Sequence, residues 1–139
     1  MATYYTGDIL EATSLSWIPL STHYGIYFIK DGLPYVAHNP LGPNIVIEPF
    51  SDFTRVRTIL RVAGHSSLSD RQIYEKALEL QKTNKWNLFT FSCEDFVRRF
   101  CNCNLGIDQR IIFASAMLLL IILIAFVVQL VKLRVKKTT

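Results

Sequence analysis

Short apolar runs separated by turn signals fill the first half of the chain and predict β-strands. Residues 22–29 (THYGIYFI) and 34–38 (PYVAH) are rich in aromatic and β-branched residues, and the turn signal Lys30-Asp31-Gly32 lies between them. These two runs therefore predict a β-hairpin. Three further runs predict strands at residues 7–12 (GDILEA), 45–48 (IVIE) and 55–62 (RVRTILRV).

The period of the pattern changes after residue 68 and predicts a helix. Ser69 precedes Gln72 by three residues, which is the spacing of a capping box. The apolar stripe that follows consists of Ile73, Tyr74, Ala77, Leu78 and Leu80. We expect this helix to end near Asn84 and residues 86–91 to be extended or loop-like. The pattern as a whole predicts an α+β fold, with a small antiparallel sheet packed with two or three helices.

One long apolar run dominates the C-terminal part. Residues 111–131 (IIFASAMLLLIILIAFVVQLV) contain no charged residue. A helix of this length spans roughly 31 Å, which is enough to cross a bilayer core. A buried core helix is the alternative, but the rest of a 139-residue chain is too small to surround it. We therefore expect a domain at 1–108, a transmembrane helix at 109–131 and a basic tail at 132–139.

The charges are divided in the same way. Residues 1–110 hold 11 basic and 11 acidic residues, whereas residues 132–139 hold four basic residues and no acid, so the net charge of +4 lies in the tail. A neutral domain lacks the basic face that nucleic-acid binding needs, so no nucleic-acid partner is expected. A basic tail suits lipid head groups, which makes the bilayer the expected partner.

The three cysteines Cys93, Cys101 and Cys103 bear on the compartment. An odd number of cysteines, without a secretory signal at the N-terminus, argues against a disulfide framework and for free thiols in a reducing compartment. By the positive-inside rule, the basic tail taken alone would lie in the cytosol. We give the missing signal more weight and expect a single-pass C-terminal anchor with the domain in the cytosol. The cysteine spacing is a poor zinc pattern, so no metal or other cofactor is expected.

Cys93 begins a second predicted helix, which runs to about Cys103 with Ser92 as its N-cap. The unpaired N–H groups and the positive dipole of a helix start favour a thiolate. The face that Cys93 shares with other residues comprises Phe96, Val97 and Phe100. Cys93 should therefore point at the body of the domain, as a nucleophile or as an inert core thiol.

Two histidines favour the nucleophile. His23 and His38 lie far from the turn of the predicted hairpin, so folding brings them near each other. They would oppose each other directly across a two-residue turn at Lys30-Asp31, or diagonally across a longer loop. A nucleophilic cysteine needs a base and a group that orients the base. The alternative is that each histidine is a partly exposed strand residue, and this is the interpretation that we prefer for His65.

Four segments carry a family pattern: residues 6–11 (TGDILE), 23–28 (HYGIYF), 32–38 (GLPYVAH) and 92–97 (SCEDFV). They resemble the lecithin:retinol acyltransferase family, and most closely its HRAS-like suppressor branch of phospholipase A and acyltransferase enzymes. The resemblance covers most of residues 6–103, and a C-terminal membrane helix fits it. It implies a permuted papain-like fold in which the histidines precede the cysteine.

The resemblance also implies roles. Cys93 would be the nucleophile, His23 the general base, and His38 the residue that orients the base. The cysteine would attack a glycerophospholipid ester and hold the acyl chain as a thioester. Water would then give phospholipase A (A1 or A2) activity, and an amine or alcohol would give acyl transfer. The family's Asn-Cys-Glu-His-Phe is Ser-Cys-Glu-Asp-Phe here, and Asp95 would oppose a thiolate if it pointed at the sulfur.

Two other functions stay open on the sequence. The altered hallmark suggests a non-catalytic membrane-interaction protein of the same fold, cellular or viral. A cysteine peptidase or amidase is less favoured, because a domain that faces lipid suits cell-wall peptides poorly. Trp17 and Ile18, near the tip of a predicted loop before His23, are candidates for contact with the membrane interface or for ordinary packing.

Overall fold

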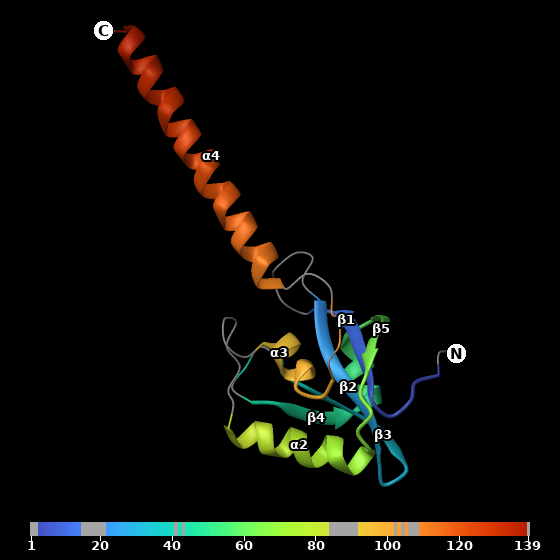
Figure 1. Cartoon of the computed structure of the whole chain (residues 1–139). Coiled ribbons are helices and arrows are strands. Elements are labelled where there is room, and N and C mark those ends of the chain that lie inside the picture. Colours follow the sequence, from blue (N-terminus) through green and yellow to red (C-terminus); the bar gives the residue numbers. More distant parts are fainter. Residues whose placement is uncertain are drawn as a thin grey trace. The chain divides into compact units, whose positions relative to one another are not determined.

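Five strands form one antiparallel sheet in the computed structural model of the chain (Figure 1). Their order is β4-β3-β2-β1-β5, and every neighbouring pair is antiparallel. The strands are β1 (Asp8–Thr13), β2 (Thr22–Lys30), β3 (Leu33–His38), β4 (Val46–Pro49) and β5 (Ile59–His65). Together with the helices described below, this confirms the predicted α+β fold with an antiparallel sheet.

The structure describes residues 3–14, 22–40, 42, 44–83, 92–101, 103, 105 and 109–138. The chain divides into two units, Met1–Gly106 and Ile107–Thr139. The candidate membrane contacts Trp17 and Ile18, the expected helix exit at Asn84 and the expected loop at 86–91 lie outside the described residues.

The predicted hairpin is confirmed, but its turn differs by one residue from the Lys30-Asp31 alternative. Asp31 and Gly32 form the two-residue turn, with φ of 52° and 75°, and Lys30 pairs with Leu33. Positive φ at both central residues is the requirement of a type I′ turn, which an Asp-Gly pair meets well. The two histidines are therefore diagonal neighbours rather than directly opposed.

A short helix, α1 (Phe50–Val56), precedes β5 and was not predicted. The prediction of a strand at 55–62 is wrong for its first residues, because the strand begins only at Ile59. Phe53 faces inward and is fully buried, and Asp52 in the first turn and Arg55 in the last complement the helix dipole. The burial of Phe53 therefore favours a helical turn over an extended strand here.

The predicted helix after residue 68 is confirmed as α2 (Asp70–Thr83). The backbone N–H of Ser69 donates to Gln72 Oε1 at 2.9 Å, as the capping-box spacing predicted. Ile73 and Ala77 are fully buried. The stripe thus packs against the sheet.

Helix α3 (Cys93–Arg98) is shorter than predicted. The N–H groups of Arg99 and Phe100 bond the carbonyls three residues earlier, which tightens and ends the last turn. Directly afterwards Cys101 and Cys103 are joined by a disulfide, with Cα atoms 5.2 Å apart. The expectation of three free thiols is therefore wrong, because Cys101 and Cys103 are joined to each other and Cys93 is the free cysteine.

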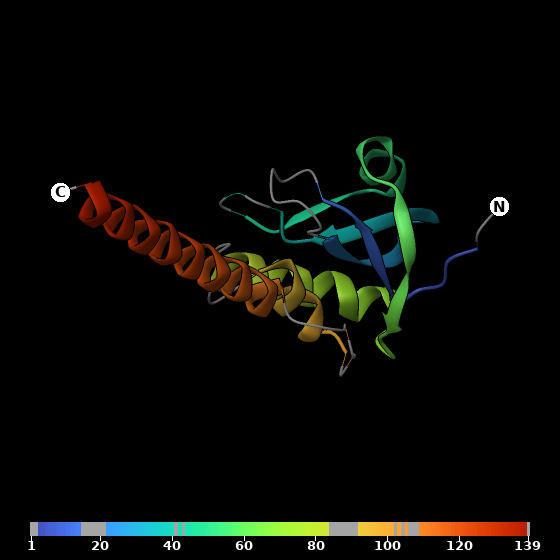
Figure 2. The same cartoon turned by 90° about the horizontal axis from the view of Figure 1, so that it is seen from above.

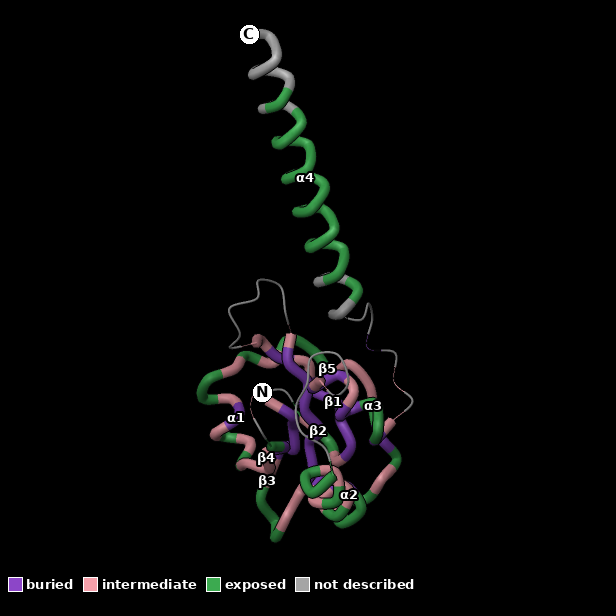
Figure 3. The backbone as a smooth tube through the Cα atoms, turned by 90° about the vertical axis from the view of Figure 1, so that its left-hand side faces the viewer, coloured by how far each residue is buried: buried purple, intermediate pink, exposed green. Residues whose placement is uncertain are grey.

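Side chains pack against both faces of the sheet. The sheet lies between α1 on one side and α2 and α3 on the other (Figure 2), and buried residues concentrate in the strands (Figure 3). The core under α2 and α3 includes Tyr24, Ile26, Phe28, Ile73 and Phe96. The core under α1 includes Leu10, Ala12, Tyr27, Val36 and Phe53. Alternate residues of β2 thus enter two different cores.

The second unit contains one helix, α4 (Gln109–Thr138), which is 30 residues long. Its described side chains from Ala114 to Gln129 are all exposed within this chain, and most are apolar. Among the described residues, no helix combines the length and the apolar character that a membrane crossing needs.

Candidate active site

The β2–β3 hairpin brings two histidines into direct contact. His23 Nε2 lies 2.8 Å from His38 Nδ1, and the rings meet edge to face. Both side chains are buried, at 7% and 2% exposure, so neither is the partly exposed strand residue of the alternative interpretation. The pair therefore forms one hydrogen-bonded unit inside the domain.

Gly25 makes this diagonal contact possible. It lies directly across the ladder from His38. A Cβ atom at Gly25 would lie 2.5 Å from Val36 Cγ1 and 3.3 Å from His38 Cβ. The missing side chain leaves the space over which His38 reaches His23. A glycine inside a strand pattern is the signal in the sequence for such a close approach, and Gly25 was not predicted as a site residue.

Glu48 extends the unit to a third group. Its Oε1 lies 2.9 Å from His38 Nε2 and 3.6 Å from Arg57 Nη1. Glu48 pairs with Val36, two residues before His38, and so lies on the same face of the sheet. Glu48 was not predicted as a site residue, although its place at the end of the fourth strand was a signal. Arg57 was not predicted either, because it follows a helix that the local sequence pattern does not indicate.

We call Glu48, His38 and His23 the proton relay. Burial lowers the pKa of His23 well below its usual value, and His38 and Arg57 add to this effect. Burial also lowers the pKa of His38, against the opposing effect of the Glu48 carboxylate. The contact with His38 lowers the pKa of Glu48. At neutral pH the relay therefore contains two uncharged rings and one carboxylate.

Phe53 forms an apolar wall beside the proton relay. Its ring centroid lies 5.2 Å from that of His38 and 6.1 Å from that of His23. The Arg57 guanidinium lies 4.9 Å from the same centroid on the Phe53 ring. Helix α1 and the residue after it thus supply both the wall and the cation of the site.

Cys93 begins α3, as predicted, and Ser92 is its N-cap. The Asp95 carboxylate accepts from the backbone N–H and the hydroxyl of Ser92, each at 2.9 Å, and so completes a capping box. Asp95 therefore points back at the helix start. The carboxylate that raises the pKa of Cys93 belongs to Glu94 instead.

The Cys93 sulfur is a neutral thiol. Burial raises its pKa to about 11, against opposing hydrogen bonds from backbone N–H groups, the first of which belongs to Tyr24. The expectation that the helix start favours a thiolate is therefore not met. Helix α3 has only six residues, and burial outweighs its N-terminal field.

Tyr24 links the sulfur to the proton relay. The β2–β3 ladder ends at the pair Gly25–His38, and the backbone N–H of Tyr24, one residue further, acts to lower the pKa of Cys93. Tyr24 directly follows His23. The Cys93 sulfur also acts electrostatically on Arg57. The structure thus brings Cys93 to the strand position next to His23, at the end of the sheet where the relay lies.

His65 lies in a different pair. It ends β5, its side chain is 56% exposed, and its Nδ1 lies 3.0 Å from Asp8 Oδ1. It takes no part in the proton relay. Across the residues that the structure describes, no group of three or more His, Cys, Asp or Glu side chains could hold a metal ion.

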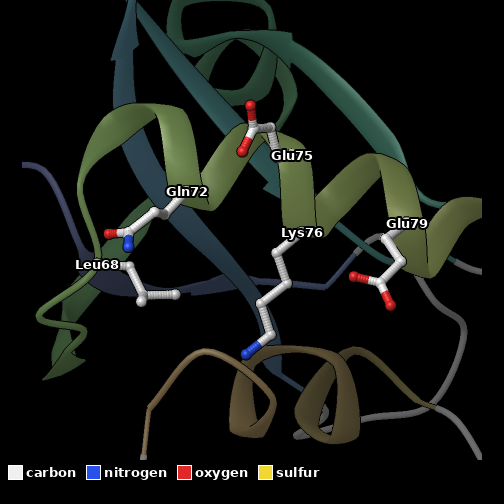
Figure 4. Close-up of a pocket in the computed structure, with 5 residues that line it drawn as sticks. All are labelled: Leu68, Gln72, Glu75, Lys76 and Glu79. Carbon is white, nitrogen blue, oxygen red and sulfur yellow. The ribbon is translucent and has the colours of Figure 1, made fainter.

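A shallow pocket of about 290 Å³ lies along α2 (Figure 4). Its lining consists of Leu68, Gln72, Glu75, Lys76 and Glu79. Lys76 points from α2 toward α3, where its Nζ donates to the carbonyl of Arg99. None of the lining residues belongs to the proton relay, so the pocket is separate from the candidate active site.

No protein-family model, characterised protein or solved structure matches this chain.

Proposed function

We propose that the chain is a thiol acyl-transfer enzyme, a membrane-anchored phospholipase A or acyltransferase that acts on glycerophospholipid esters. The observation that carries this proposal is the proton relay, whose last ring belongs to His23, next to the residue whose backbone N–H acts to lower the pKa of Cys93. A buried thiol one strand residue away from an uncharged imidazole supports general-base activation, in which a base takes the proton of the nucleophile.

In the first half of the reaction, His23 takes the proton of the Cys93 thiol as the sulfur attacks the ester carbonyl carbon. A C–S bond forms, and the carbonyl oxygen becomes an oxyanion that backbone N–H groups at the start of α3 stabilise. The ester C–O bond then breaks. The His23 imidazolium returns its proton to the departing lysophospholipid oxygen, which leaves the acyl chain on Cys93 as a thioester.

In the second half, His23 takes a proton from water, an amine or an alcohol, which attacks the thioester carbonyl. The C–S bond breaks and the sulfur recovers the proton from His23. Water as acceptor gives a free fatty acid, and an amine or alcohol gives an acylated product.

The lipid substrate and the anchor rest on the sequence. The resemblance to the lecithin:retinol acyltransferase family and its permuted papain-like fold supports a phospholipid ester. The uncharged run at 111–131 supports a single-pass anchor, and the basic residues of 132–139 suit lipid head groups.

A non-catalytic membrane-interaction role is the second candidate. Two observations favour it: Cys93 is 7% exposed, with a pKa of about 11, and the hallmark motif is altered. Such a protein would keep the fold and the histidine pair but form no thioester.

One experiment separates the two candidates. The full chain is incubated in mixed micelles with phosphatidylcholine, and its intact mass is measured. The enzyme gains one acyl mass, loses it to hydroxylamine, and shows neither event as Cys93→Ser. A folded chain that gives no adduct and releases no fatty acid supports the non-catalytic role.

A further inference from the structure

We propose that Glu48 is a positioning residue that selects the tautomers of both histidines, so that Nδ1 of His23 carries the free lone pair, and that Arg57 holds Glu48 in its ionised form. The inference rests on the proposed function, because it names the atom that acts as the base. The contacts that support it lie within the sheet and are present whether or not the chain is catalytically active.

The first step concerns Glu48. An ionised carboxylate can only accept hydrogen bonds. Its Oε1 lies 2.9 Å from His38 Nε2 but without hydrogen-bond alignment, and its negative charge at this distance favours the Nε2–H tautomer of the neutral His38 ring. His38 Nδ1 is then an acceptor.

The second step passes this choice to His23. His38 Nδ1 lies 2.8 Å from His23 Nε2, so His23 must carry its proton on Nε2 and donate. A neutral imidazole has one N–H, which leaves Nδ1 of His23 with a free lone pair. The carboxylate thus determines, two rings away, which nitrogen can accept the thiol proton.

The third step concerns what holds Glu48 in place. Arg57 lies 3.6 Å from Glu48 Oε1, its side chain is only 10% exposed, and its guanidinium lies against the Phe53 ring. The positive charges of Arg57 and Arg55 both favour the ionised carboxylate. Without the negative charge of Glu48, His38 could carry its proton on Nδ1. His23 would then have to carry its own proton on Nδ1, and that nitrogen could no longer act as the base.

The test is a long-range ¹H–¹⁵N correlation spectrum of the full chain in micelles, labelled at histidine nitrogens. The His65→Gln and His23→Gln variants assign the three rings. We expect the Nε2–H tautomer at both His23 and His38. An Nδ1–H tautomer at either ring in the unmodified chain overturns the proposal.

Variants then test the role of Glu48. Glu48→Ala should give mixed tautomers at His38 and His23 and lower kcat by about 100-fold, with KM nearly unchanged, because general-base catalysis contributes about 10²–10⁴. Glu48→Asp should restore part of the Nε2–H population and of kcat. Glu11→Gln is the matched control, since Glu11 is also a sheet carboxylate paired with an arginine, at 2.6 Å from Arg61.

The spectrum separates the two proposals. Unchanged tautomers in a folded Glu48→Ala or Glu48→Gln variant overturn the positioning role, whatever the activity. The expected tautomers in a chain that forms no thioester support the positioning role and remove the proposed function.

Discussion

Gly25 faces His38 across the β2–β3 ladder, and its missing side chain lets the two histidines meet. The first prediction follows from this relationship. In Gly25→Ala, the new methyl group would lie 2.5 Å from Val36 Cγ1, so Val36 or His38 must shift. We expect a loss of about 1–3 kcal/mol in the free energy of unfolding, measured in urea, and a slower thioester formation.

Gly42→Ala is the control for this change. A Cβ at Gly42 meets no atom within 4 Å, so this variant should keep its stability and activity. Equal losses in both variants would show that backbone effects, rather than the space beside His38, cause the change.

The second prediction concerns alkaline pH. The pKa of Cys93 is raised by burial to about 11 in the folded chain, so the unfolded chain releases this proton at lower pH than the folded chain does. The folded state therefore binds more protons between the ordinary thiol pKa and about 11, and the free energy of unfolding must fall as pH rises through that window. Cys93→Ser should show a smaller fall than the unmodified chain in urea titrations at matched pH values. Parallel curves would contradict the raised pKa.

The third prediction concerns acid. Burial lowers the pKa values of His23 and His38, so the unfolded chain binds protons that the folded chain does not as pH falls below the ordinary histidine value. The free energy of unfolding should therefore fall as pH drops below about 6.5. His23→Gln should reduce this loss, whereas His65→Gln should keep it. An equal loss of stability in His23→Gln would show that a group other than His23 causes the dependence on acid.

The fourth prediction concerns the ion pair beside the sulfur. Arg98 Nη2 lies 2.7 Å from Glu94 Oε1, and Glu94, which is 2% exposed, raises the pKa of Cys93. Arg98→Ala should slow alkylation of Cys93 by iodoacetamide. It should also lower the free energy of unfolding by about 1–2 kcal/mol, a modest loss because the arginine is partly exposed. Glu94→Gln should speed the alkylation.

Arg99→Ala removes a positive charge one residue away and serves as the matched control. Cys101 and Cys103 are joined to each other, so Cys93 is the thiol that the reagent reports. Equal rates in Arg98→Ala and Arg99→Ala would exclude a specific effect of the Glu94 pair.

The local parts of the fold could be predicted from the sequence. The β2–β3 hairpin, the capping box of α2 and the cap at Ser92 each depend on a few neighbouring residues. Helix α1 could not, because its seven residues have no side-chain cap and the burial of Phe53, which favours the helix, depends on distant residues. The turn register depends on a choice between two adjacent dipeptides, and only the positive φ of Asp31 and Gly32 settles it.

The candidate site shows the same limit. The proximity of His23 and His38 follows from strand spacing. The meeting of Glu48 with Arg57 depends on β4 and on the end of α1, two elements whose tertiary positions no local pattern encodes. The raised pKa of Cys93 reflects burial by distant residues, which a helix-start argument does not include.

The alternation along β2 limits how this strand can change in length. Its nine residues place Tyr24, Ile26 and Phe28 in the core under α2 and α3, and place His23 and Gly25 on the side of α1. Loss or gain of a single residue within the strand would exchange these two sets. The aromatic rings would then meet α1, and the imidazole would enter an apolar core without its acceptor. Substitutions can alter one side at a time, but an insertion or deletion in β2 must damage packing and chemistry together.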